Sequence, residues 1–222
     1  MPVNRRRNHS PRRVPGRGFS LIEVLVTMVL ILVGLLGVLT MQAHAAKVEF
    51  ESYQRGQALS LVHDMESRLG ASRAIVQAGF MNAALSSTDG RVYVGSGSGA
   101  TNFADGTGNC VAPAPGDTLA AAKFEMCQWA LALQGAAAKD GAANVGAMLS
   151  ARGCLIRIDP PQANAIADFY VVVVWQGVSA GAEPLDDAPA GKNLCASDTN
   201  FGTGLRRGLS MRVMVPDLAK TL

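Results

Sequence analysis

Residues 19–41 read FSLIEVLVTMVLILVGLLGVLTM, a strongly apolar stretch that contains one charged residue, Glu23. As a helix rising about 1.5 Å per residue, this stretch spans roughly 35 Å, which is enough to cross the hydrocarbon core of a membrane. A carboxylate at this depth costs roughly 2–3 kcal/mol or more in a bilayer, so it needs a partner. The stretch therefore predicts a membrane-spanning helix whose acid serves a purpose beyond anchoring.

The charge on either side of the apolar stretch predicts its orientation. Six of the 20 basic residues lie in residues 1–17, where there is no acid, whereas Lys47 and Arg55 are the nearest basic residues that follow. By the positive-inside rule the N-terminal leader stays in the cytoplasm and the rest of the chain is exported. Beyond Gly18 the remaining 14 basic residues are outnumbered by 17 acidic ones, so no nucleic-acid partner is expected.

The junction between Gly18 and Phe19 changes from polar to apolar sequence in a single step. Cleavage there would create an α-ammonium group on Phe19 at the edge of the membrane. In a helical assembly, the ammonium group of one subunit could neutralise Glu23 of the next, and this attraction is stronger in a low dielectric than in water. The three residues Gly18, Phe19 and Glu23 are therefore the candidate processing and assembly site.

The decapeptide R-G-F-S-L-I-E-V-L-V, residues 17–26, resembles the class III signal of type IV pilins and pseudopilins. The resemblance implies that prepilin peptidase removes residues 1–18 and that Phe19 is N-methylated. It also implies that Glu23, at the fifth mature position, takes part in subunit assembly.

Two other interpretations of the N-terminus remain. An ordinary signal peptide could be cut after Ala45, in the A-x-A pattern of residues 43–45, which would release a soluble binding module or enzyme. A secretory apolar region is typically about 7–15 residues, much shorter than this one, and is not expected to hold an acid. The other possibility, an unprocessed signal anchor, leaves Glu23 unexplained.

The helical pattern continues beyond the apolar stretch, over residues 42–70. Ala58, Val62, Met65 and Leu69 follow the spacing of one helix face, and Gly70 is a plausible stop. We predict one helix from about Phe19 to Leu69, with a membrane half (19–41) and an amphipathic half (42–70). The residues expected on the solvent face are Glu49, Glu51, Gln54, Arg55, Asp64, Glu66 and Arg68.

Residues 71–222 are expected to form an exported globular domain with one further helix and a few strands. Asp117 is a good N-cap for a helix running to about Gln134, with Gly135 as its terminator. The segment 135–149 is rich in Ala and Gly and predicts a linker. Strands are predicted at 91–94, 154–158, 169–175 and 209–215, with four consecutive valines marking 169–175 as central. The predicted fold class is α+β, with the long helix packed on a small antiparallel sheet.

The histidines and cysteines restrict the possible chemistry. The three histidines are His9, His44 and His63, so no Ser-His-Asp set, Cys-His set or histidine-containing zinc site can form from Arg73 onward. No enzymatic activity, cofactor or metal is expected. The four widely spaced cysteines favour disulfides. Cys127 could bridge to Cys110, and Cys154 to Cys195 across a long loop, although three connectivities are open.

The predicted arrangement of helix, sheet and disulfide-bounded C-terminal loop is similar to the pilin fold. Within that family the chain resembles minor pilins, through the Met41-Gln42 pair, Cys195, and Arg206-Arg207 before a final strand. The resemblance implies a single-pass inner-membrane precursor with its C-terminal domain in the periplasm, which joins a priming or tip complex of an extracellular pilus. Its implied partners are prepilin peptidase, other minor pilins and the major pilin. A minor pseudopilin of type II secretion is the nearest alternative. Arg206 and Arg207 could contact a partner or DNA, but a solvated charge pair before a strand is more frequent, and a solvated pair is predicted.

Overall fold

The structure is a computed structural model, and it describes residues 18–71, 73–81, 91–95, 110–135, 139–141, 143–144, 146, 148–158 and 165–216. Contacts divide the chain into an N-terminal unit, Met1–Ala46, and a second unit, Lys47–Leu222, called the body below. Of the predicted leader, residues 1–18, all but Gly18 lie outside the described residues. The loop segment 96–109 also lies outside them.

The predicted long helix is confirmed as α1, Leu21–Ala71. Its amphipathic part lies in the body, where Ala58, Val62, Met65 and Leu69 are all fully buried. The assignment of Gln54 to the solvent face was wrong, because Gln54 is 1% exposed and begins the same buried row, one turn before Ala58. The buried row places the amphipathic half of α1 on the main core of the body.

The body contains a four-stranded antiparallel sheet with the order β1-β4-β5-β6. Its register pairs Leu155 with Val171 and Phe169 with Val213. A second, two-stranded sheet of β2 and β3 lies within the segment that the sequence predicts as a linker. The strands are β1 Arg91–Gly95, β2 Lys139–Asp140, β3 Ala143–Asn144, β4 Arg152–Arg157, β5 Ala165–Gln176 and β6 Arg206–Pro216.

The run of valines in β5 is explained by cover on both faces of the sheet. Val171 and Val173 belong to the main core, which also contains residues of α1 and α3. Val172 and Val174 belong to a second, smaller core with Cys154, Cys195 and Phe201. Because successive side chains of a strand point to opposite faces, a strand covered on both sides needs a continuous apolar sequence.

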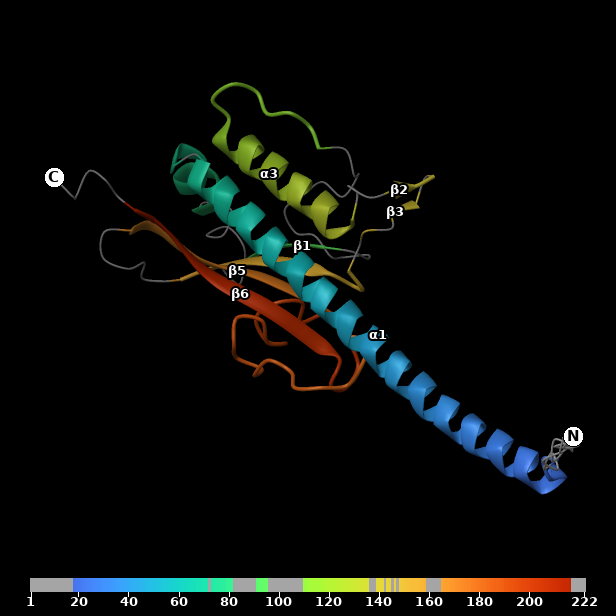
Figure 1. Cartoon of the computed structure of the whole chain (residues 1–222). Coiled ribbons are helices and arrows are strands. Elements are labelled where there is room, and N and C mark those ends of the chain that lie inside the picture. The colour runs from blue at the N-terminus through green and yellow to red at the C-terminus, as the bar shows by residue number, and fades with distance from the viewer. Residues whose placement is uncertain are drawn as a thin grey trace, which may run out of the picture. The chain divides into compact units, whose positions relative to one another are not determined.

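The second long helix, α3, spans Thr118–Leu133 and matches the prediction at both ends. The Ala120 N–H donates to Asp117 Oδ1 over 2.9 Å as an N-cap, and Gly135 takes a positive φ of 70° after the last turn. Figure 1 shows α3 beside the amphipathic half of α1, and the buried Trp129 joins them by donating from its indole to Leu61 O over 2.9 Å.

Two local features bring α3 close to its neighbours. A Cβ on Gly153 of β4 would lie 2.5 Å from the Trp129 ring, so glycine allows the ring to pack directly on the strand. A short π-helix, η1, Ile75–Phe80, packs against α3 and buries Val76 and Phe80. The sequence pattern predicted no element here.

Candidate processing and assembly site and the disulfide-bounded loop

The candidate site at the N-terminus lies at the first turn of α1. Gly18, Phe19 and Ser20 precede the helix, and Ser20 O accepts from the N–H groups of Glu23 and Val24 over 3.0 and 3.3 Å. Phe19 is 84% exposed, and Glu23 is the acidic residue of the first turn. A negative side chain at a helix N-terminus interacts favourably with the helix dipole.

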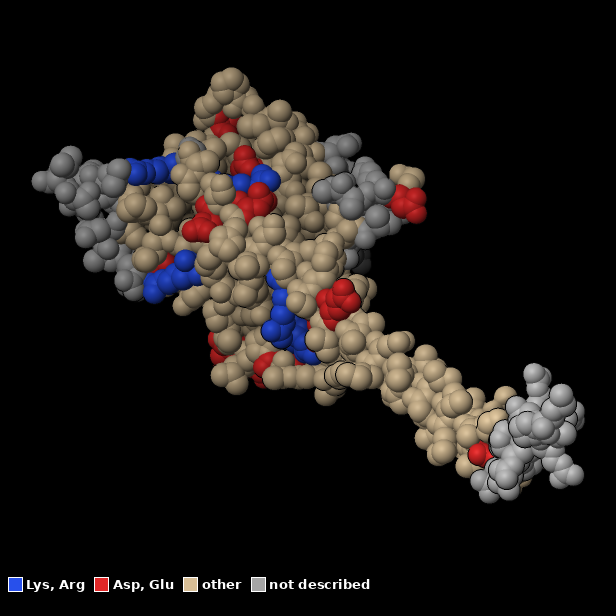
Figure 2. All heavy atoms as spheres, viewed as in Figure 1, with Lys and Arg blue, Asp and Glu red and all other residues tan. Residues whose placement is uncertain are grey.

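Glu23 is the only charged residue between Gly18 and Ala46. Figure 2 agrees, since the visible face of the described part of the N-terminal unit is uncharged apart from one small acidic patch. The hydroxyls of Thr27 and Thr40 donate to Val24 O and Gly37 O over 2.9 and 2.8 Å, so these polar groups are satisfied within the helix. The Glu23 carboxylate forms no such internal bond among the described residues.

The helix that carries this site is apolar enough to cross a membrane. Its most apolar 18-residue window has a mean hydropathy of 2.8, and none of that window is buried by the rest of the chain. Leu30, Ile31 and Leu36, for example, are 61–66% exposed. Such a continuous apolar surface is typical of a segment covered by lipid or by other helices.

Both disulfides lie in the body. Cys110 and Cys127 are joined with a Cα–Cα distance of 5.5 Å, and Cys154 and Cys195 with a distance of 5.9 Å. The second bond confirms the prediction of a disulfide-bounded C-terminal loop, since it ties β4 to the connection between β5 and β6. This connection, residues 177–205, is called the C-terminal loop below.

Arg206 holds the interior of the C-terminal loop together through hydrogen bonds, in addition to the disulfide. The guanidinium donates to Ala190 O over 3.0 Å, to Gly191 O over 3.2 Å and to Cys195 O, and it lies 4.9 Å from the centre of the Phe201 ring. Arg206 is 5% exposed, and burial lowers the pKa of its guanidinium, opposed by Glu183 and Asp186. The prediction of a solvated arginine pair was wrong.

Arg207 joins the C-terminal loop to α1. Its guanidinium donates to Ser179 O over 2.6 Å and to Gly204 O over 2.9 Å, and it lies 3.7 Å from Glu51 Oε1. Glu51 also accepts from the Ser179 hydroxyl over 2.7 Å. That hydrogen bond, with the attraction of Arg207 and Arg55, lowers the pKa of the Glu51 carboxyl despite its partial burial. Glu51 was predicted on the solvent face, and the structure half-buries it.

Other described side chains give no indication of a catalytic or metal centre. No group of three His, Cys, Asp or Glu side chains lies close enough to hold a metal ion within the described ranges. His63 is exposed, and its Nδ1 lies 2.9 Å from Leu59 O of the preceding turn. The buried Asp168 pairs with Arg212 across the sheet over 2.6 Å, which is a structural interaction between β5 and β6.

Comparison with known protein families identifies a motif at the N-terminus. Residues 16–39 match the family model described as the prokaryotic N-terminal methylation motif. The matched segment contains Gly18, Phe19 and Glu23. The chain therefore carries the N-terminal motif of type IV pilin-like proteins, over a small part of its length. No curated protein and no solved structure matched the chain.

Proposed function

We propose that the chain is a minor pilin, a non-enzymatic structural subunit of a type IV pilus. The observation that carries the proposal is a methylation motif at the start of an apolar helical segment. Glu23 is the one charged residue of this segment, and it pairs with no other described residue. The architecture of the body, one long helix on a small antiparallel sheet with a disulfide-bounded loop, supports the same conclusion.

In this proposal the precursor is held in the inner membrane by residues 19–41, with the body in the periplasm. Prepilin peptidase cleaves between Gly18 and Phe19, and the new N-terminus is methylated. Glu23 then pairs with the ammonium group of a neighbouring subunit. The desolvation cost of the isolated acid is offset only in the assembled state, so the pairing favours polymerisation and fixes the axial register of the subunit.

Among the minor pilins, we propose that the chain acts as a type IV pilus modification protein, PilV. The support is the Met41-Gln42 pair after the apolar stretch, and Cys195 followed by Arg206-Arg207 and a final strand. The proposed role is to join a priming or tip complex that starts or adjusts pilus assembly, with effects on twitching motility and adhesion. Its partners would be other minor pilins and the major pilin.

The test is the mature N-terminus of protein recovered from sheared fibres. N-methylated Phe19 as the first residue is the expected result. A protein found in fibres that still begins upstream of Phe19 would refute the assigned processing. A soluble product that begins at Ala46 would instead support a secreted module cut after Ala45.

The nearest alternative, a minor pseudopilin of type II secretion, has the same motif and the same helix, so N-terminal processing does not separate the two. A deletion strain does separate them. Loss of twitching with normal exoprotein secretion supports the pilus. Loss of secretion with normal twitching supports the pseudopilin.

A further inference from the structure

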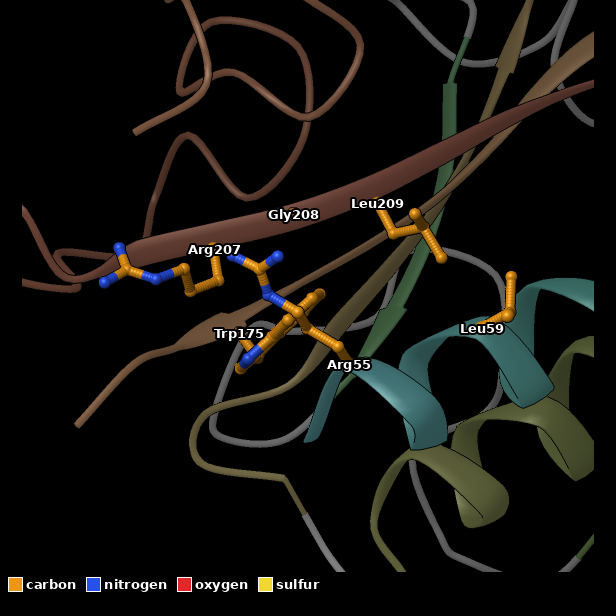
Figure 3. Close-up of a pocket in the computed structure, with 6 residues that line it drawn as sticks. All are labelled: Arg55, Leu59, Trp175, Arg207, Gly208 and Leu209. Carbon is orange, nitrogen blue, oxygen red and sulfur yellow. The ribbon is translucent and has the colours of Figure 1, made fainter. Parts of the chain in front are cut away.

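A pocket of about 300 Å³ lies in the body between α1 and the start of β6 (Figure 3). Pockets for small-molecule ligands are commonly about 300–1,000 Å³, so this one has room for one or two amino-acid side chains. None of the processing or disulfide residues contributes to it. It is lined by Arg55, Leu59, Trp175, Arg207, Gly208 and Leu209.

The two arginines at the pocket differ in how their guanidinium groups are used. That of Arg207 already donates to Ser179 O and Gly204 O and pairs with Glu51. Arg55 is exposed and forms no hydrogen bond or close ion pair within the described residues, and its attraction to Glu51 is a longer-range one. Figure 3 shows its side chain extending from α1 toward Gly208. Arg55 therefore has donors available to a ligand.

The lining of the pocket carries two positive charges, those of Arg55 and Arg207. The guanidinium of Arg207 is paired with Glu51 over 3.7 Å. The other positive charge, that of Arg55, has no close partner within the described residues. A single carboxylate would neutralise it, and a guanidinium can hold a carboxylate through two parallel hydrogen bonds.

The remainder of the pocket is apolar. Trp175 is buried, while Leu59 is 47% exposed and Leu209 is half-buried. Figure 3 places Leu59 of α1 and Leu209 of β6 on the same side of the pocket. An aliphatic side chain next to the carboxylate would cover both leucines, and β6 is the last strand in the order of the described sheet, so a partner chain can approach it from the outside.

We infer that this pocket binds a carboxylate with a neighbouring aliphatic side chain, presented by a different protein subunit of the same assembly. The inference rests on the proposed function for the identity of the partner. A lipid phosphate fits less well, because one available guanidinium and two leucines match a singly charged, partly apolar group better than a phosphate.

The test uses the full-length chain produced in cells that assemble fibres, with a photoreactive benzoylphenylalanine in place of Leu59. We expect a crosslink to a second pilus subunit, at a peptide with Asp, Glu or a C-terminal carboxylate beside an aliphatic residue. Arg55→Glu should lower the crosslink yield about tenfold, and Arg55→Lys should retain most of it. Arg73→Glu is the matched control, since it makes the same charge change at another exposed arginine of the body.

A charge exchange completes the test. Replacing the crosslinked carboxylate by lysine should restore the yield of the Arg55→Glu variant. A crosslink to a second copy of this chain, to lipid, or to a peptide without a carboxylate would overturn the inference, as would a yield that Arg55→Glu leaves unchanged. Methylated Phe19 in fibres without such a crosslink would refute carboxylate binding by the pocket but would still support the proposed function.

Discussion

At the scale of single residues, Gln54 is the least expected side chain in the body. It lies in the buried row of α1 and is 1% exposed, yet neither its Oε1 nor its Nε2 has a hydrogen-bond partner among the described residues. A buried polar group without a partner keeps its full desolvation penalty, about 1–3 kcal/mol. We therefore expect the amide to reduce the stability of the contact between α1 and the main core.

We predict that Gln54→Met stabilises the protein, because methionine keeps the unbranched shape and removes the unpaired amide. The free energy of unfolding should rise by about 1–2 kcal/mol, as measured by denaturant titration of the full chain in detergent. Gln57→Met is the control, since Gln57 donates to Tyr53 Oη over 2.8 Å, and that change should give no gain. A destabilised Gln54→Met protein would mean that the amide is satisfied inside the native protein.

Glu51 gives a prediction for pH, because its pKa is lowered below the ordinary value of 4.5, chiefly by the Ser179 hydroxyl. A carboxyl whose pKa is lower in the folded state stabilises the fold above its unfolded pKa, and the stabilisation is lost as pH falls through the folded pKa. The protein should therefore be more stable than Glu51→Gln at pH 7. The difference should disappear as pH falls below about 4.5.

Unfolding titrations at several pH values would measure this difference. Glu49→Gln is the control, because Glu49 is an exposed acid on the same helix. A Glu51→Gln protein whose stability follows that of the unmodified chain at every pH would contradict the role of Glu51 as the link to Ser179 and Arg207.

At the scale of elements, Arg206 is expected to be as important to the C-terminal loop as its disulfide. Arg206→Met keeps an apolar stem but leaves the carbonyls of Ala190, Gly191 and Cys195 without their donor. We expect a loss of about 3 kcal/mol in the free energy of unfolding and faster proteolysis of residues 177–205 with the disulfide intact. Lys192→Met removes an exposed pair with Asp186 in the same loop and should change neither. An unaltered rate of proteolysis in Arg206→Met would show that the disulfide alone holds the loop.

The elements also show what the sequence could predict and what it could not. The row from Ala58 to Leu69 and the valines of β5 were predictable, because burial follows a period within a single element. Burial of Arg206 and Arg207 was not, since their acceptors come from residues 179–204, whose path the sequence does not specify. For the same reason, neither the burial of the polar Gln54 nor the formation of η1 could be predicted, because both depend on packing against distant segments.

The two candidate sites also differ in how far the sequence could predict them. Gly18, Phe19 and Glu23 form a local motif, with the chemistry set by neighbours in the sequence, so the order of the residues alone is enough to recognise it. The pocket of Arg55 is assembled from α1, β5 and β6, which are far apart in the sequence. Arg55 on its own resembles any exposed arginine on a helix, and only the fold brings it beside Trp175 and Leu209.

At the scale of the whole molecule, the single helix α1 has two parts of different chemistry. Up to Ala46 it carries a single charge and none of its residues is buried, whereas beyond Lys47 it supplies the buried row of the body. A defect in the first part should therefore leave folding of the body unchanged and appear only in assembly. Glu23 is the residue on which this separation can be tested.

We predict that Glu23→Ala inserts into the membrane normally but enters fibres at least about tenfold less than the unmodified chain, because no acid remains to pair with a neighbour's ammonium group. Membrane fractionation, disulfide formation in the body, and immunoblots of sheared fibres measure the three steps separately. Glu49→Ala removes an acid of the same helix outside the apolar stretch and should assemble normally. If Glu23→Ala reaches fibres at the normal level, the carboxylate does not direct assembly. If it fails to insert, the acid acts before assembly, during export.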